Sequence, residues 1–107
     1  PYAAAKWGVV GLTLSLAKEL GAANIRVNAI LPGVVAGPRI DRVIKDRAKL
    51  RGMPREELEN EFLAQASLGE FISPQSVADM AVYLASEEGR QISGQSLSVC
   101  GNIHTLV

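Results

Sequence analysis

The sequence is poor in the residues that build metal centres and disulfides. Its 107 residues include one cysteine, Cys100, and one histidine, His104. A single cysteine excludes an internal disulfide and a cysteine-based zinc cluster, and it is typical of a reducing cytoplasm. His104 has no second ligand at metal spacing, so we interpret it as a surface or subunit-contact residue. Cys100 is interpreted as a small packed side chain, and no metal is expected.

Excess charge and long apolar runs are also missing. Eleven Lys and Arg balance eleven Asp and Glu, so no overall field draws the chain to nucleic acid or an anionic membrane. No apolar run approaches the ~20 residues that span a bilayer, and the chain starts without a signal-type segment. We therefore expect a cytoplasmic protein that binds neither nucleic acid nor membranes.

Residues 2–20 carry the strongest helical signal, because alanines and leucines favour helix. The stretch is apolar almost all round, which predicts a helix buried on more than one side, against a sheet and against another helix or subunit. Gly8 and Gly11 suggest close packing within it, and Gly21 is well placed to end it. Trp7 is interpreted as a core residue.

The rest of the chain predicts two short strands separated by helices. The apolar runs 25–31 and 95–100 are typical of strands, the first being a buried parallel one. Helical periodicity covers roughly 40–50 and 54–66, and Ser73-Pro74 predicts the start of a helix that runs to about residue 86. With 48% hydrophobic residues the chain is globular, and its length allows one domain at most.

Two parallel strands joined by helices are part of an α/β sheet, and two strands alone leave most of the apolar helical surface uncovered. The expected fold class is therefore α/β, and residues 1–107 are interpreted as a single partial domain. The sequence favours the C-terminal part of a larger doubly wound parallel sheet, with about two strands and three to four helices.

Tyr2 and Lys6 are four residues apart, so they share one helix face with Cβ atoms roughly 6 Å apart. A phenol that exchanges protons at neutral pH needs its anion stabilised. One ammonium roughly 5 Å away supplies about 3 kcal/mol at an effective dielectric of about 20. The pair is chemically sufficient as an acid/base, but taken alone it is more simply interpreted as an aromatic and a solvated cation on a helix flank.

Five stretches, taken in order, resemble the C-terminal portion of the short-chain dehydrogenase/reductase family. The resemblance covers nearly the whole chain and implies a Rossmann-like, three-layer α/β/α fold. Its motifs are Tyr2-Ala-Ala-Ala-Lys6, Ile25-Arg-Val-Asn-Ala-Ile-Leu-Pro-Gly33, Ser73-Pro-Gln-Ser-Val-Ala-Asp79, Tyr83-Leu-Ala-Ser86 and Ile92-Ser-Gly-Gln95.

The resemblance implies an NAD(P)-dependent oxidoreductase that interconverts a secondary alcohol and a ketone, for example of a 3-oxoacyl or 3-hydroxy acid type. Tyr2 would exchange the proton, and Lys6 would bind the nicotinamide ribose and stabilise the phenolate. Pro32, Gly33 and the backbone of Val35 would line the nicotinamide of NAD or NADP.

The resemblance also implies assembly into a homodimer or homotetramer through helix 2–20. Asn28 is interpreted as a structural hydrogen-bonder. Gly37 stands where many members carry a threonine that contacts the cofactor. The glycine-rich phosphate loop, the residue that selects NAD or NADP and the catalytic serine do not occur in these 107 residues. An inactive oligomerisation or interaction piece, and an isomerase or dehydratase on the same fold, therefore stay open.

Basic residues are dense between positions 39 and 55, a region that the resemblance identifies as a lid over the substrate. A basic lid would favour an anionic substrate or an acyl carrier with a phosphopantetheine arm. The alternative is two solvated helix faces paired with each other, including Asp41 with Lys45. The basic residues are Arg39, Arg42, Lys45, Arg47, Lys49, Arg51 and Arg55.

Overall fold

The computed structural model describes residues 1–103 and confirms the expected α/β class, with four helices and a two-stranded parallel sheet. Short 3-10 turns follow the first and last helices, at Gly21–Ala23 and Glu87–Gly89. His104 lies outside the described residues. The elements in order are α1 (Tyr2–Leu20), β1 (Ala29–Pro32), α2 (Pro38–Arg51), α3 (Arg55–Ala64), α4 (Pro74–Ala85) and β2 (Ser96–Val99).

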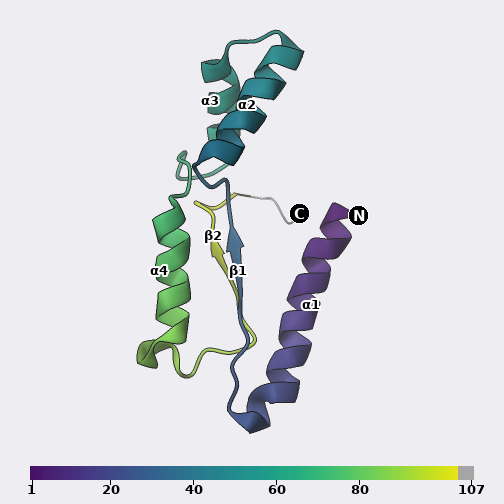
Figure 1. Ribbon diagram of the computed structural model, residues 1–107, viewed down its shortest axis with the longest axis vertical. Helices are drawn as coiled ribbons and strands as arrows, with labels where there is room; N and C mark the ends of the chain where they lie inside the picture. The colour runs from purple at the N-terminus through teal and green to yellow at the C-terminus, as the bar shows by residue number, and fades with distance from the viewer. Residues whose placement is uncertain (104–107) are drawn as a thin grey trace.

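The elements form three layers, with α4 on one side of the sheet and α1 on the other (Figure 1). The helices α2 and α3 form a separate pair beyond the carboxyl ends of the strands. Because α1 runs opposite to β1, the N-terminus of α1 lies at that same end of the sheet (Figure 1). In open parallel sheets this end is where ligands bind.

Helix boundaries follow the sequence signals closely. Ser73 caps α4 as expected, since its Oγ accepts from the Ser76 amide at 3.1 Å. Two details differ from expectation. Pro54 precedes α3 as its N-cap, one residue before the predicted first-turn position. Gly21 ends α1 as its C-cap, as predicted, but it keeps right-handed dihedrals, and the left-handed residue that turns the chain is Asn24, whose amide donates to the Gly21 carbonyl.

The first strand is shorter than predicted, because β1 begins at Ala29 and not at residue 25. Just before β1, hydrogen bonds that involve side chains take the place of the backbone hydrogen bonds of the sheet. Asn28 donates to the Ile92 carbonyl at 2.9 Å and accepts from the Gln95 amide at 3.1 Å, while the Val27 amide donates to Ser93 Oγ at 3.2 Å. Asn28 is therefore the structural hydrogen-bonder that was expected. The last strand likewise covers only Ser96–Val99.

The buried core is small and divided. One cluster lies between α2 and α3, formed by Ile44, Ala48 and Leu58. The chain exposes 7604 Å², whereas a globular monomer of its mass exposes about 5,800 Å². Its radius of gyration is 16.7 Å, against about 13 Å for a compact domain of this length. Much apolar surface is therefore left uncovered.

The helix α1 accounts for much of this surface, so the prediction that it is buried on more than one side is wrong within this chain. Thr13 is its only buried residue, and Trp7 is 56% exposed, which contradicts a core role for the indole. A Cβ added at Gly8 or Gly11 would meet nothing within 4 Å. The reason is that the two strands cover only one side of α1. The other sides are exposed, and Leu12, for example, is 58% exposed.

Arg26 joins the end of α4 to the start of β1, a role that the sequence did not reveal. Its Nη1 donates to the carbonyls of Leu84 at 2.6 Å, Gly89 at 2.9 Å and Ile92 at 3.3 Å. Carbonyls at a helix C-terminus lack intrahelical partners, and a cation there is favourable. One partly buried guanidinium therefore fixes the turn after α4.

We expect Arg26→Met to destabilise the fold by about 2–3 kcal/mol, because it keeps the aliphatic stem but leaves these carbonyls without a charged donor. Urea unfolding of the full-length protein measures the change. Arg42→Met, at an exposed position of α2, is the matched control and should change stability by less than about 0.5 kcal/mol. Equal effects of the two substitutions would contradict the role given to Arg26.

Candidate functional site

Tyr2 and Lys6 lie one turn apart at the start of α1, on one helix face as predicted. The Lys6 Nζ is 5.3 Å from the centroid of the Tyr2 ring. The Tyr2 side chain is 73% exposed, so its hydroxyl is accessible to a ligand. Water screens the ammonium in this setting, and a bound ligand that excluded water would strengthen the influence of Lys6 on the phenol.

Pro32 and Gly33 end β1 beside the last residues of β2. Pro32 pairs with Val99, and the Gly33 amide donates to the Val99 carbonyl at 2.9 Å. A Cβ at Gly33 would lie 2.7 Å from the Cys100 Cα and 3.0 Å from its carbonyl oxygen. The absence of a side chain at Gly33 is therefore required by Cys100, the residue that follows β2.

Val35 continues the sheet beyond β1 through an isolated parallel bridge to Ile72. The bridge uses the neighbours of Val35: the Ile72 amide donates to the Val34 carbonyl, and the Ala36 amide donates to the Ile72 carbonyl, both at 2.8 Å. The N–H of Val35 consequently points away from Ile72. It has no acceptor within residues 1–103, so this donor is free for a ligand.

The helices α2 and α3 are held together by charges as well as by their apolar cluster. Arg51 pairs with Glu61 at 2.7 Å, and the Arg47 guanidinium lies 5.6 Å from the Phe62 ring centroid. Asp41 pairs with Arg55 at 3.0 Å, so its predicted pairing with Lys45 is wrong, because α3 brings a different cation to this carboxylate. The interpretation that the two charged helix faces pair with each other is therefore confirmed for Arg51 and Arg55.

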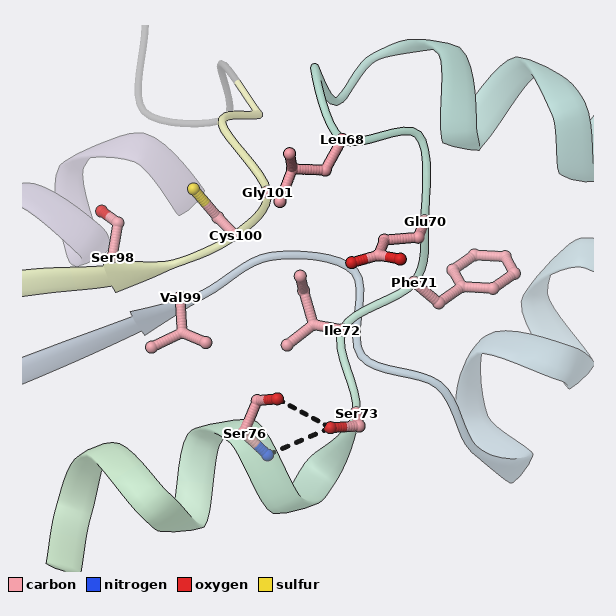
Figure 2. A pocket seen from close by; sticks show the side chains of 10 residues that line it. All are labelled: Leu68, Glu70, Phe71, Ile72, Ser73, Ser76, Ser98, Val99, Cys100 and Gly101. Atoms are coloured by element: carbon pink, nitrogen blue, oxygen red, sulfur yellow. Dashed lines mark hydrogen bonds between the residues drawn. The ribbon is translucent and has the colours of Figure 1, made fainter.

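A pocket of about 450 Å³ opens beside the carboxyl end of β2 and was not predicted. Figure 2 shows the Glu70 carboxylate pointing into it, with the Ser73 cap of α4 at its lower edge. Ser73, the N-cap of α4, and Ser76 within α4 line this pocket, and none of the predicted site residues does. The Ser73-Pro74 signal located the helix terminus, but no sequence signal indicated a cavity next to it.

The part of the chain that the structure describes has neither a candidate metal site nor a candidate membrane-spanning helix. Residues 1–103 contain no group of three or more His, Cys, Asp or Glu side chains placed to hold a metal ion. Within the same residues, no helix combines the length and apolar character needed to cross a membrane.

Comparisons with known proteins agree on one family. Residues 1–104 match a family model described as enoyl-(acyl carrier protein) reductase. The chain is 39% identical over 102 residues to a 3-oxoacyl-(acyl-carrier-protein) reductase of Chlamydia muridarum, covering 95% of this chain and 37% of that protein. The chain thus spans well under half the length of this curated relative.

Solved structures give the same result. A short chain dehydrogenase family protein from Francisella tularensis superposes with a TM-score of 0.85 at 26% identity, covering 90% of this chain and 40% of the other. A crystal structure of the F189W variant of actinorhodin polyketide ketoreductase with NADPH gives 0.81 at 35% identity, covering 92% and 38%. The chain therefore belongs to the short-chain dehydrogenase/reductase family.

Proposed function

We propose that the protein is an NAD(P)-dependent oxidoreductase that interconverts a secondary alcohol and a ketone, with a 3-oxoacyl or 3-hydroxyacyl compound as substrate. The observation that carries the proposal is the placement of Tyr2 and Lys6. The Lys6 Nζ lies 5.3 Å from the Tyr2 ring centroid on an accessible helix face, at the end of the sheet where the parallel strands terminate. The relatives' names supply the substrate class.

In the direction of reduction, Tyr2 would donate its hydroxyl proton to the carbonyl oxygen of the substrate. Lys6 would stabilise the resulting phenolate and bind the nicotinamide ribose. Pro32 and Gly33 would line the nicotinamide, and the free N–H of Val35 would donate to its carboxamide. Bound NADH or NADPH would supply the hydride that reduces the carbonyl carbon.

The proposal includes a larger domain and an assembly. Within residues 1–103 the sheet has only the two strands β1 and β2, and a parallel sheet of two strands is too small to be stable by itself. We take residues 1–107 as the C-terminal portion of a larger sheet, with the phosphate loop and catalytic serine supplied by the rest of the enzyme. The exposed apolar side chains of α1, Trp7 and Leu12 among them, support a homodimer or homotetramer, and we place the enzyme in the cytoplasm.

The test is consumption of NADH or NADPH by the full-length enzyme in the presence of a 3-oxoacyl thioester. We expect saturable oxidation of one of the two cofactors that requires the ketone. Binding of neither cofactor would favour an inactive interaction piece. Conversion of substrate without net oxidation of the cofactor would favour an isomerase or dehydratase, and either result would contradict the proposal.

A further inference from the structure

The helix pair formed by α2 and α3 is attached to the rest of the chain through the two segments that enter and leave it. Within residues 1–103, these helices pack on each other, and neither packs extensively on α1, α4 or the sheet. The entering segment ends at Gly37, which has φ of 148° and caps α2 without a side-chain hydrogen bond. An added Cβ at Gly37 would meet nothing within 4 Å, so this attachment is loosely packed. The firmer attachment is on the segment that leaves α3.

The leaving segment, residues 66–68, forms backbone hydrogen bonds with the turn that follows β2. The Ser67 amide donates to the Asn102 carbonyl at 3.3 Å, and the Leu68 amide donates to the Gly101 carbonyl at 3.1 Å. Figure 2 shows Leu68 beside Gly101. We call this contact between the two segments the clasp. It ties the helix pair to the end of β2, although α3 and β2 are far apart in the sequence.

A hydrogen bond between two side chains adds to the clasp. Asn102 Nδ2 donates to Ser67 Oγ at 2.6 Å. Asn102 has φ of 63°, in the left-handed region that asparagine tolerates better than most residues with a side chain. Gly101 before it has φ of 61°, so two left-handed residues in succession turn the chain toward Ser67. Because the bond joins side chains, it can be removed without altering the backbone bonds of the clasp.

The clasp acts on the end of the sheet where the reaction is proposed. Figure 1 places α2 and α3 beyond the carboxyl ends of β1 and β2, the same end at which the N-terminus of α1 lies. Ligands of open parallel sheets bind at this end. The helix pair therefore borders the space beside Tyr2, and its position relative to the strands determines how a ketone fits there. The clasp fixes that position because it joins the helix pair to β2.

We propose that Asn102 is a positioning residue, which acts through Ser67 to hold α2 and α3 in place beside the substrate. This inference rests on the proposed function and adds a residue that controls the affinity for the ketone. Tyr2 and Lys6 lie on α1, so the clasp does not position the reacting groups. An interaction that serves the ground state and the transition state alike changes KM and leaves kcat unchanged.

The test uses Asn102→Gly in the full-length enzyme, because glycine keeps the left-handed turn and removes the carboxamide. We expect the KM for a 3-oxoacyl thioester to rise about three- to tenfold, the effect of one lost hydrogen bond. The kcat and the KM for NADH or NADPH should not change. Asn102→Asp should restore the KM, since the Ser67 hydroxyl can donate to a carboxylate. Gln75→Ala is the matched control: it removes an exposed 2.7 Å side-chain bond to Asp79 on α4 and should leave the KM unchanged.

A double variant tests whether Asn102 acts through Ser67. Ser67→Ala should raise the KM by about the same factor as Asn102→Gly, and the two substitutions together should raise it no further, because both remove the same bond. Effects that multiply would show that the two side chains act separately and would overturn the proposal. An unchanged KM in Asn102→Gly, or a fall in kcat at constant KM, would overturn it as well.

Hydrogen exchange needs no turnover and separates this inference from the proposed function. We expect the amides of Ser67 and Leu68 to exchange at least ~threefold faster in Asn102→Gly, since both donate across the clasp. Unchanged exchange would overturn the clasp even in an enzyme that reduces the ketone. Faster exchange in a protein whose wild type does not reduce the ketone would contradict the proposed function, and with it the role of Asn102 in substrate affinity.

Discussion

Replacement of Tyr2 by Phe is expected to lower the turnover of the full-length enzyme by at least ~100-fold, because a positioned proton donor contributes about 10²–10⁴-fold. The substitution removes one oxygen from a side chain that is 73% exposed and makes no hydrogen bond within residues 1–103. The folded structure and the affinity for cofactor should therefore change little. Steady-state kinetics and a cofactor titration on the same preparation measure both.

Tyr83→Phe is the matched control for this prediction. Tyr83 is half exposed on α4, on the other side of the sheet from α1, and has no part in the proposed chemistry. The control should retain normal turnover. If Tyr2→Phe also turned over normally, the acid/base role of Tyr2 would be wrong, and the simpler interpretation of an aromatic beside a solvated cation would replace it.

Gly33→Ala is expected to destabilise the fold by about 3 kcal/mol or more, because overpacking against backbone atoms cannot be relieved by a rotamer change. The new Cβ would lie 2.7 Å from the Cys100 Cα, so the strands β1 and β2 would have to separate at their carboxyl ends. This displacement would also move Val35 and its free N–H. Loss of stability should be accompanied by weaker binding of NAD(P)H.

Urea unfolding and a cofactor titration of the full-length enzyme test this prediction. Gly21→Ala is the matched control, since Gly21 has φ of −58° and an added Cβ meets nothing within 4 Å. That variant should be as stable as the wild type or slightly more stable. Normal stability of Gly33→Ala would show that the close approach to Cys100 is not required in the folded enzyme.

The sequence predicted the elements and the Tyr2–Lys6 geometry because both depend on neighbours along the chain. Helical periodicity places residues four apart on one face, and the pattern Ser73-Pro74 begins a helix for local reasons. The parallel sheet was predicted from two apolar runs that are separated by helical segments. These features need no knowledge of which distant residues meet.

The features that escaped prediction depend on contacts between distant segments. Arg26 finds its three carbonyl partners 58 to 66 residues later, and Gly33 meets Cys100, the residue after β2. The pocket beside β2 arises where a loop, a strand and α4 meet. The exposure of α1 has another cause. An apolar helix surface predicts that the surface is buried, but it does not show that the segment packed against it lies within residues 1–103.

The central claim is that the enzyme passes a hydride between a nicotinamide and a carbonyl carbon while Tyr2 handles the proton. The most direct measurement uses cofactor deuterated on one face of C4 and follows the label into the product of the full-length enzyme. We predict one deuterium at the new carbinol carbon from one of the two faces, and the same label, formed at least ~100-fold more slowly, with Tyr2→Phe. Product formed without deuterium from either face would contradict the account.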